Sequence, residues 1–190
     1  MTRKIKIAVF ASGSGSNFAA IAEACQLGEL NAEIVLMVTN KPEAYVVERA
    51  KQAGIPVAAF RPKEFNTKDT YEEAILEALR EAGVEWLVLA GYMRLIGQPL
   101  LEAYPSNIVN IHPSLLPSFP GIDAIEQAVK HGVKVTGVTV HLVDEGMDTG
   151  KILAQRAVNV ADGDVNKTAE AIHAVEHDLY KETLNSLFSR

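Results

Sequence analysis

The chain has 190 residues, a formal net charge of −6 at pH 7 and a single cysteine. This length is typical of one domain with a sizeable core, and the acidic balance gives no general attraction to nucleic acid or other polyanions. The lone Cys25 excludes an internal disulfide and a cysteine-based metal cage, and its place in a predicted helix favours core packing. No apolar run approaches the roughly 20 residues of a membrane helix, so we expect a cytoplasmic protein.

Short, continuous apolar runs alternate with helix-like periodicity through the first half of the chain. Runs of this kind indicate strands that are covered on both faces. The first run follows a basic head but is too short and interrupted for a signal peptide. We expect strands over residues 5–11, 34–38, 57–60, 86–90 and 108–111, and helices over 17–27, 44–53, 70–82 and about 99–104. Gly54 and Gly83 stand where a left-handed residue would end a helix.

The second half of the chain has a different pattern. Strands are predicted over 133–142 and 152–160, joined by a tight acidic loop, and a long amphipathic helix is predicted over about 166–188. The chain contains no repeat, low-complexity segment or flexible linker. Together these elements predict one α/β domain over 1–190, with a doubly wound, mostly parallel sheet that ends in antiparallel pairing.

A turn of small residues, SGSGSN at 12–17, follows the first predicted strand. Small side chains let the backbone approach a ligand, and the free N–H groups at the start of a helix favour a phosphate. An ordinary N-cap made by Ser16 or Asn17 is the structural alternative. A dinucleotide site fits poorly, because Phe18 stands where glycine is needed and no acidic residue follows the second strand. The turn therefore favours a phosphomonoester.

Two polar side chains close the fifth predicted strand. Asn110 and His112 are two residues apart, so they share one face at the carboxyl end, where open α/β sheets bind ligands. Prolines at 113, 117 and 120 stiffen the loop that follows. The amide and a protonated imidazole would both donate to a developing oxyanion, and the histidine can move a proton near neutral pH. A structural Asn and His at a strand end is the alternative.

An acidic loop, DEGMDTG at 144–150, follows a strand that contains His141. One of its carboxylates would orient the imidazole of His112 and favour its charged form. A solvated hairpin connection is the alternative, and a metal site at this loop matches no known ligand spacing. The sequence has neither a nucleophile elbow nor a Walker motif. An amide, an imidazole and a carboxylate beside a phosphate site favour acyl-type transfer through a tetrahedral intermediate, without a covalent enzyme adduct.

These segments resemble the folate-dependent formyltransferases, and the resemblance covers essentially the whole chain. It is carried by FASGSGSN at 10–17, LAGYMRLI at 89–96, NIHPSLLPSFPG at 110–121, GVTVHLVDEGMDTG at 137–150 and IHAVEHDLY at 172–180. The opening loop, the chain length and the ending are similar to the phosphoribosylglycinamide (glycinamide ribonucleotide) branch. The resemblance implies a Rossmann-like formyltransferase fold, with a phosphate-binding half at about 1–105 and a folate and catalytic half at about 106–190.

The resemblance also implies an activity: the formyl group of the co-substrate 10-formyltetrahydrofolate is transferred to the amine of 5-phosphoribosylglycinamide in purine biosynthesis, with no metal. Asn110 and His112 would stabilise the oxyanion, His112 would donate a proton, and Asp148 would keep His112 charged and help order a water. The phosphoribosyl substrate would contact Gly15, Ser16, Asn17, His173, Ala174, Val175 and Glu176. The folate would contact Lys68, Met93, Arg94, Leu95, Ile96, Asn110, Asp144, Glu145, Gly146, Met147 and Asp148.

Several positions depart from the family's usual pattern. Lys68 stands where the family often has arginine, which weakens any bidentate contact. The other departures remove no catalytic group; they are Ser14, Lys151, Ala171 and Lys181. The alternatives are a formyltetrahydrofolate hydrolase, a formyltransferase acting on methionyl-tRNA or a sugar, and a non-catalytic nucleotide-binding regulatory module. We expect small-molecule substrates, no nucleic acid or membrane partner, and a monomer or homodimer.

Overall fold

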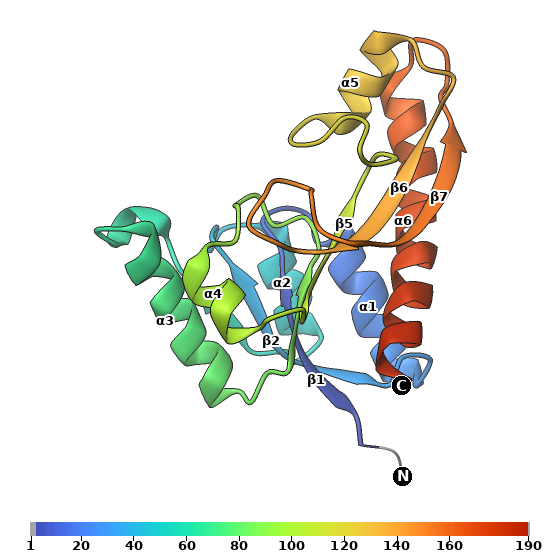
Figure 1. The fold of residues 1–190 in the computed structure, drawn as a ribbon. Helices are drawn as coiled ribbons and strands as arrows, with labels where there is room; N and C mark the ends of the chain where they lie inside the picture. Colours follow the sequence, from blue (N-terminus) through green and yellow to red (C-terminus); the bar gives the residue numbers. More distant parts are fainter. Residues whose placement is uncertain (1–2, 190) are drawn as a thin grey trace.

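Residues 3–189, the part of the chain that the computed structural model describes, form a twisted sheet between two layers of helices (Figure 1). The strands are β1 (Ile5–Phe10), β2 (Ala32–Thr39), β3 (Val57–Ala59), β4 (Trp86–Leu89), β5 (Ile108–His112), β6 (Val135–Leu142) and β7 (Ile152–Asn159). The helices are α1 (Ser16–Leu27), α2 (Tyr45–Gln52), α3 (Lys68–Glu81), α4 (Gln98–Ala103), α5 (Ala124–His131) and α6 (Val165–Phe188), with a short 3-10 turn η1 (Pro62–Glu64).

The sheet has the strand order β3-β2-β1-β4-β5-β6-β7. The pairs from β3 to β5 are parallel, whereas β6 is antiparallel to both β5 and β7. The predicted fold class, a mostly parallel doubly wound sheet with late antiparallel pairing, is confirmed. The helix α5 was not predicted, because it directly follows a stretch rich in proline and glycine that obscures its start.

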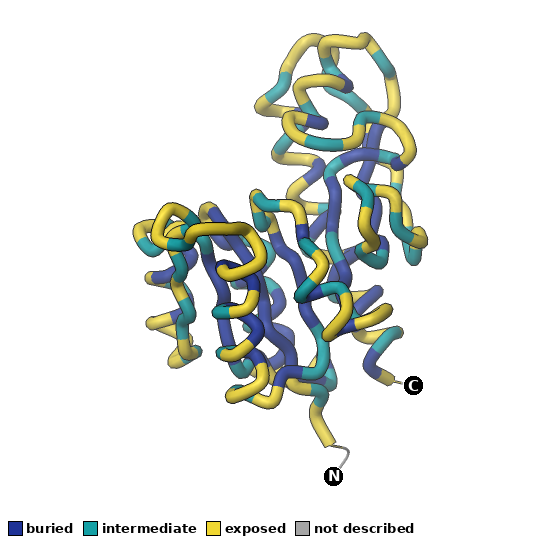
Figure 2. The backbone as a smooth tube through the Cα atoms, turned by 60° about the vertical axis from the view of Figure 1, so that its left-hand side comes forward, coloured by how far each residue is buried: buried dark blue, intermediate teal, exposed yellow. Residues whose placement is uncertain are grey.

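The central strands are buried on both faces, which explains their continuous apolar sequence (Figure 2). In and just after β1, Ile7, Val9 and Ala11 pack in a core with α1, α2 and α6. Ala8 and Phe10 point the other way and pack with α3 and α4. Alternate side chains of one strand therefore join two separate apolar layers.

Glycines end two of the helices as the sequence predicts. Gly54 follows α2 with a φ of 68°, and Gly83 follows α3 with a φ of 67°. Cys25 is a core-facing residue of α1, and burial raises the pKa of its thiol to about 11. This thiol therefore stays protonated near neutral pH, in agreement with a packing role.

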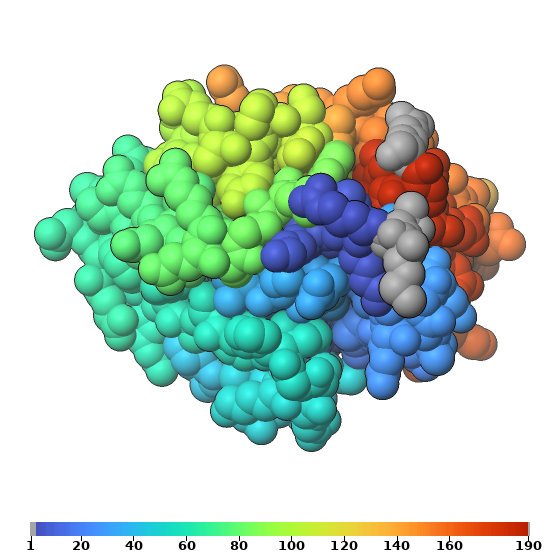
Figure 3. Space-filling model, turned by 90° about the horizontal axis from the view of Figure 1, so that it is seen from below, coloured from blue at the N-terminus to red at the C-terminus, as the bar shows by residue number. Residues whose placement is uncertain are grey.

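The strand order places a ligand crevice between β1 and β4. From β1 the chain builds β2 and β3 on one side, and then returns to build β4 and β5 on the other. The loops that leave the carboxyl ends of β1 and β4 diverge at this switch point, which opens a crevice between them. At the opposite end, the start of β1 lies beside the end of α6 (Figure 3). Among the helices of residues 3–189, none is both long and apolar enough to cross a membrane.

Candidate active site

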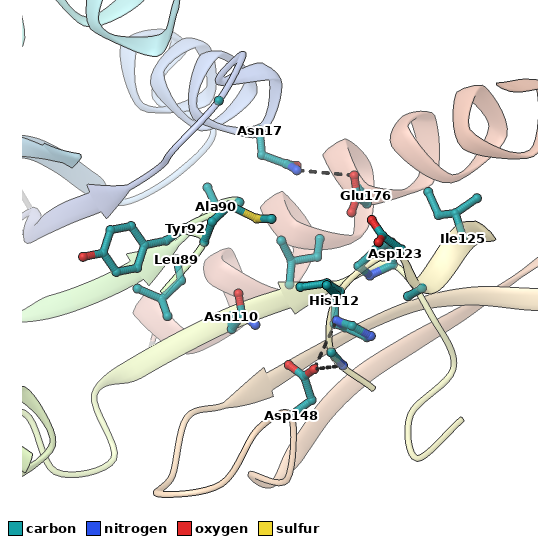
Figure 4. A pocket seen from close by; sticks show the side chains of 18 of the residues that line it. Asn17, Leu89, Ala90, Tyr92, Asn110, His112, Asp123, Ile125, Asp148 and Glu176 are labelled. Atoms are coloured by element: carbon teal, nitrogen blue, oxygen red, sulfur yellow. Dashed lines mark hydrogen bonds and ion pairs between the residues drawn. The ribbon is translucent and has the colours of Figure 1, made fainter. Parts of the chain in front are cut away.

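A cavity of about 590 Å³ opens at the carboxyl ends of β1, β4 and β5. Its wall is formed by the turn after β1, the loop after β4, the end of β5 with its following loop, the segment 141–148, and α6 (Figure 4). Every predicted site residue lines this cavity except Lys68, Asp144, Glu145, Ala174 and Val175. A volume of this size lies within the range of sites for small-molecule ligands.

The turn after β1 presents an uncapped helix start to the cavity. The N-cap of α1 is Gly15, in the left-handed conformation with a φ of 76°, and no side chain caps the helix. The ordinary cap by Ser16 or Asn17 is therefore not formed. A Cβ atom at Gly15 would lie 2.5 Å from Cγ2 of Val46, so only glycine fits without displacing α2. Backbone N–H groups without a capping side chain favour an anion at this position.

Ser12 connects this turn to the loop after β4. Its hydroxyl donates to Oδ1 of Asn40 at 2.5 Å and accepts from the backbone N–H of Met93 at 2.9 Å. The side chain is buried, with 3% of its surface exposed. These bonds fix the two loops on either side of the switch point relative to each other.

His112 is held between a carbonyl and a carboxylate. Its Nε2 lies 2.9 Å from the carbonyl oxygen of Phe119, and its Nδ1 lies 3.5 Å from Oδ2 of Asp148 (Figure 4). Because a carbonyl oxygen only accepts, Nε2 carries a hydrogen and Nδ1 is the nitrogen that faces the carboxylate. Protonation of Nδ1 therefore makes an imidazolium that is stabilised on both sides.

Asp148 is oriented by groups from three segments. Its Oδ2 accepts the backbone N–H of Gly121 at 2.7 Å, and its Oδ1 lies 3.7 Å from Nε2 of His141. Burial alone would raise the pKa of Asp148, but the bond to His141, the Gly121 N–H and the charge of His112 together lower it below its ordinary value. The carboxylate is thus charged at neutral pH.

His141 is a site residue that the sequence did not single out. Its Nδ1 donates to the carbonyl of Leu142 at 2.9 Å, and its Nε2 lies 3.3 Å from Nδ2 of Asn110. A neutral ring accepts from this amide, whereas a protonated ring donates to Asp148. The contact follows from the antiparallel register, in which Asn110 pairs with His141 across β5 and β6. His141 can therefore be identified as a site residue only when the pairing of β5 with β6 is known.

Glu176 connects α6 to the turn after β1. It is 5% exposed, and its Oε2 accepts from Nδ1 of His173 at 2.8 Å and from Nδ2 of Asn17 at 3.4 Å (Figure 4). The hydrogen bond to Glu176 raises the pKa of His173, although partial burial opposes the shift. The carboxylate therefore lies beside the turn after β1, at the wall of the cavity.

The predicted residues outside the cavity wall have other surroundings. Lys68, on α3, forms an ion pair of 3.9 Å with Glu72. Oδ1 of Asp144 accepts from the backbone of Gly146 at 3.0 Å and from Thr149 Oγ1 at 2.6 Å, which closes the acidic loop. Glu145 and Ala174 are exposed, and Val175 packs against the core. Among the described side chains, no group of three or more His, Cys, Asp or Glu is placed to hold a metal ion.

Comparison with known proteins agrees with this geometry. Residues 5–184 match the family model described as formyl transferase. The chain belongs to the formyl transferase family. This formyltransferase is 53% identical over 183 residues to the phosphoribosylglycinamide formyltransferase of Bacillus subtilis, a match that covers 96% of the chain and 94% of that protein.

Solved structures give the same family relationship. The formyltransferase superposes on phosphoribosylglycinamide formyltransferase from Bacillus halodurans with a TM-score of 0.95 at 53% identity, covering 97% of this chain and 96% of that one. Glycinamide ribonucleotide transformylase 1 from Symbiobacterium toebii gives a TM-score of 0.96 at 40% identity, covering 100% and 90%. Both the sequence and the fold therefore place the chain in the phosphoribosylglycinamide branch.

Proposed function

We propose that this enzyme transfers the formyl group of 10-formyltetrahydrofolate to the amine of 5-phosphoribosylglycinamide. The observation that carries the proposal is that one cavity joins an uncapped helix start to Asn110, His112 and Asp148. A phosphorylated amine acceptor needs the first feature, and transfer through a tetrahedral intermediate needs the second. The family relationship supports the same acceptor and the same formyl donor.

The phosphoribosyl substrate lies along the wall from α1 to α6. Its phosphate binds the backbone N–H groups of Gly15, Ser16 and Asn17, where the positive end of the α1 dipole favours it. Glu176 accepts hydrogen bonds on the ribose and glycinamide side, and His173 orients its carboxylate. The substrate amine then points toward the end of β5. Val175 packs against the core and Ala174 is exposed outside the cavity wall, so neither residue touches the substrate.

The folate occupies the more apolar wall. Met93, Leu95 and Met147 line the cavity with 63%, 44% and 55% of their surfaces exposed, which leaves apolar area for a pterin to cover. Lys68 lies outside this wall, and a contact with the glutamate tail of the folate would have to form beyond it. Asp144 shapes the loop that carries Met147 through its bonds to Gly146 and Thr149. Met93 belongs to the half of the chain at about 1–105 and Met147 to the half at about 106–190, so both halves contribute to the folate side.

The reaction needs charge stabilisation and proton transfer, both of which this site offers. The amine attacks the formyl carbon, and the formyl oxygen becomes an oxyanion that the amide of Asn110 and the imidazolium of His112 stabilise. His112 donates a proton to the leaving folate nitrogen as its bond to carbon breaks. The amine loses its extra proton through a water that Asp148 helps to order. The net change is one proton moved from the amine to the folate.

The proposal is tested by following both products at once. Wild-type protein with both substrates is expected to release one tetrahydrofolate for each formylated glycinamide ribonucleotide, measured by absorbance and mass spectrometry. Release of formate without the amine substrate would indicate a hydrolase, and transfer to methionyl-tRNA or an amino sugar instead would indicate another formyltransferase. Binding of both substrates without any turnover would contradict the enzyme assignment and indicate a regulatory module.

A further inference from the structure

A buried carboxylate lies behind the folate wall of the cavity, on the helix α3. Glu72 is 2% exposed, and its Oε1 accepts the backbone N–H of Gly97 at 2.8 Å. Gly97 is the N-cap residue of α4, and this helix has no side-chain cap from its own N-cap residue. Glu72 therefore caps α4 from a neighbouring helix.

This cap fixes one end of a short loop that lines the cavity. The loop, Met93–Ile96, runs directly into α4. Its other end is held by the bond from the Met93 N–H to Oγ of Ser12, at 2.9 Å. Within the loop, Ile96 is buried in the core while Met93 and Leu95 are exposed toward the cavity. Two hydrogen bonds therefore hold the ends of this loop, one to Ser12 in the turn after β1 and one to Glu72 on α3.

The surroundings of Glu72 indicate a role beyond ordinary packing. Its Oε2 is buried and has no hydrogen-bond partner among the described residues. The same is true of Nε of Arg94, which belongs to the loop Met93–Ile96. The guanidinium of Arg94 lies 5.1 Å from the ring centre of Tyr71, the residue before Glu72. Burial raises the pKa of Glu72, although the Gly97 N–H and the charge of Lys68 oppose this shift. A buried acid with one free oxygen costs stability, so its presence here is consistent with a role other than stabilising the fold.

We propose that Glu72 is a positioning residue for the folate side of the site: by capping α4 from α3, it holds Met93–Ile96 where the pterin binds. The inference rests on the proposed function, and it adds a residue that touches neither substrate. The proposal predicts an effect on one of the two substrates only. Loss of the cap should weaken folate binding, while binding at the phosphate turn on the other wall stays unchanged.

The first test compares Glu72→Ala and Glu72→Gln with the same changes at Glu73, which is exposed on the same helix. Glu72→Ala is expected to raise the KM for 10-formyltetrahydrofolate about tenfold, in line with the loss of a buried hydrogen-bonded acceptor. The KM for 5-phosphoribosylglycinamide should stay within about twofold, since its wall is intact. Glu72→Gln should recover most of the loss, because its amide oxygen still accepts from Gly97. Both Glu73 variants should match the wild type.

A second test approaches the same bond from Gly97. A Cβ atom at Gly97 would lie 2.9 Å from Oε2 of Glu72, so Gly97→Ala should displace the carboxylate and raise the folate KM as Glu72→Ala does. The double variant should be no worse than Glu72→Ala alone, because the carboxylate that the Gly97→Ala change would displace is gone. The remaining close atom, Cε of Lys68 at 3.1 Å, lies near the end of a flexible side chain that can move away. Hydrogen exchange at the backbone amide of residue 97, followed by NMR, should be faster than in the wild type in Glu72→Ala, in Gly97→Ala and in the double variant. Circular dichroism verifies that each variant is folded.

The outcomes separate this inference from the proposed function. A wild-type protein without formyl transfer would overturn the function, whereas Gly97 exchange would still report the cap. An active wild type whose Glu72→Ala variant matches Glu73→Ala would overturn the positioning role. Equal rises in both KM values, or additive effects in the double variant, would also overturn it. If Glu72→Ala does not fold, Gly97→Ala decides the question by the same KM comparison.

Discussion

Replacing His112 with alanine is expected to lower kcat by about three orders of magnitude, because the change removes both a proton donor and a charged oxyanion partner. The KM for 5-phosphoribosylglycinamide should change little, since the phosphate turn and Glu176 remain in place. The measurement is steady-state kinetics of formyl transfer at neutral pH, with circular dichroism to verify the fold. Within residues 3–189, the substitution removes one hydrogen bond of this ring, to the carbonyl of Phe119, and one ion pair, to Asp148, so the fold should survive.

His177→Ala is the matched control for this prediction. His177 is also a partly buried histidine, on α6, but it does not line the cavity. Its variant should keep kcat within about threefold of the wild type, as expected for changes away from the reacting groups. A folded His112→Ala variant with a kcat within tenfold of the wild type would show that the imidazole is not the proton donor.

Replacing Asp148 with asparagine is expected to lower kcat by about two orders of magnitude, because His112 loses the charge that favours its protonated form. Asparagine suits the position sterically. The backbone of Asp148 is left-handed, with a φ of 56°, and asparagine tolerates this conformation well. Its amide oxygen can still accept the Gly121 N–H. The change therefore removes charge with little change of shape, and kinetics at neutral pH measure the loss.

The pH dependence of stability gives a second measurement on the same variant. The pKa of Asp148 is lowered in the folded state from its ordinary value of 3.8. The carboxylate thus stabilises the fold fully above that value, and this contribution is lost as the pH falls through the lowered pKa. Denaturant unfolding should show wild type more stable than Asp148→Asn at neutral pH, with the gap closing under strong acid. Asp162→Asn, at an exposed ion pair, should show no comparable loss of kcat. A stability gap that widens in acid would contradict the account.

The sheet could be predicted from the sequence because strands that are buried on both faces consist of continuous apolar residues. Continuous apolar runs marked the parallel strands, and the two-residue period correctly placed Asn110 and His112 on one face. The helix α5 has no comparably clear sequence pattern. It directly follows a stretch rich in proline and glycine, and its N-cap, Asp123, is a left-handed residue that makes no side-chain cap bond.

The surroundings of the site could not be predicted, because they depend on backbone groups and on register. The carbonyl of Phe119 and the N–H of Gly121 hold His112 and Asp148, yet neither group depends on the identity of its side chain. His141 reaches the site only through its pairing across β5 and β6. Glu72 and Glu73 are identical neighbours in the sequence, but only packing against α4 distinguishes the buried one from the exposed one.

The most direct measurement of the central idea is a crystal structure with 5-phosphoribosylglycinamide and a non-transferable folate analogue bound together. We expect the phosphate on the amides of residues 15–17 and the substrate amine about 3–3.5 Å from the carbon that stands for the formyl group. The oxygen on that carbon should accept from both Asn110 and His112. A complex in which the amine approaches the folate away from the end of β5, or in which His112 turns out of the cavity, would contradict the account.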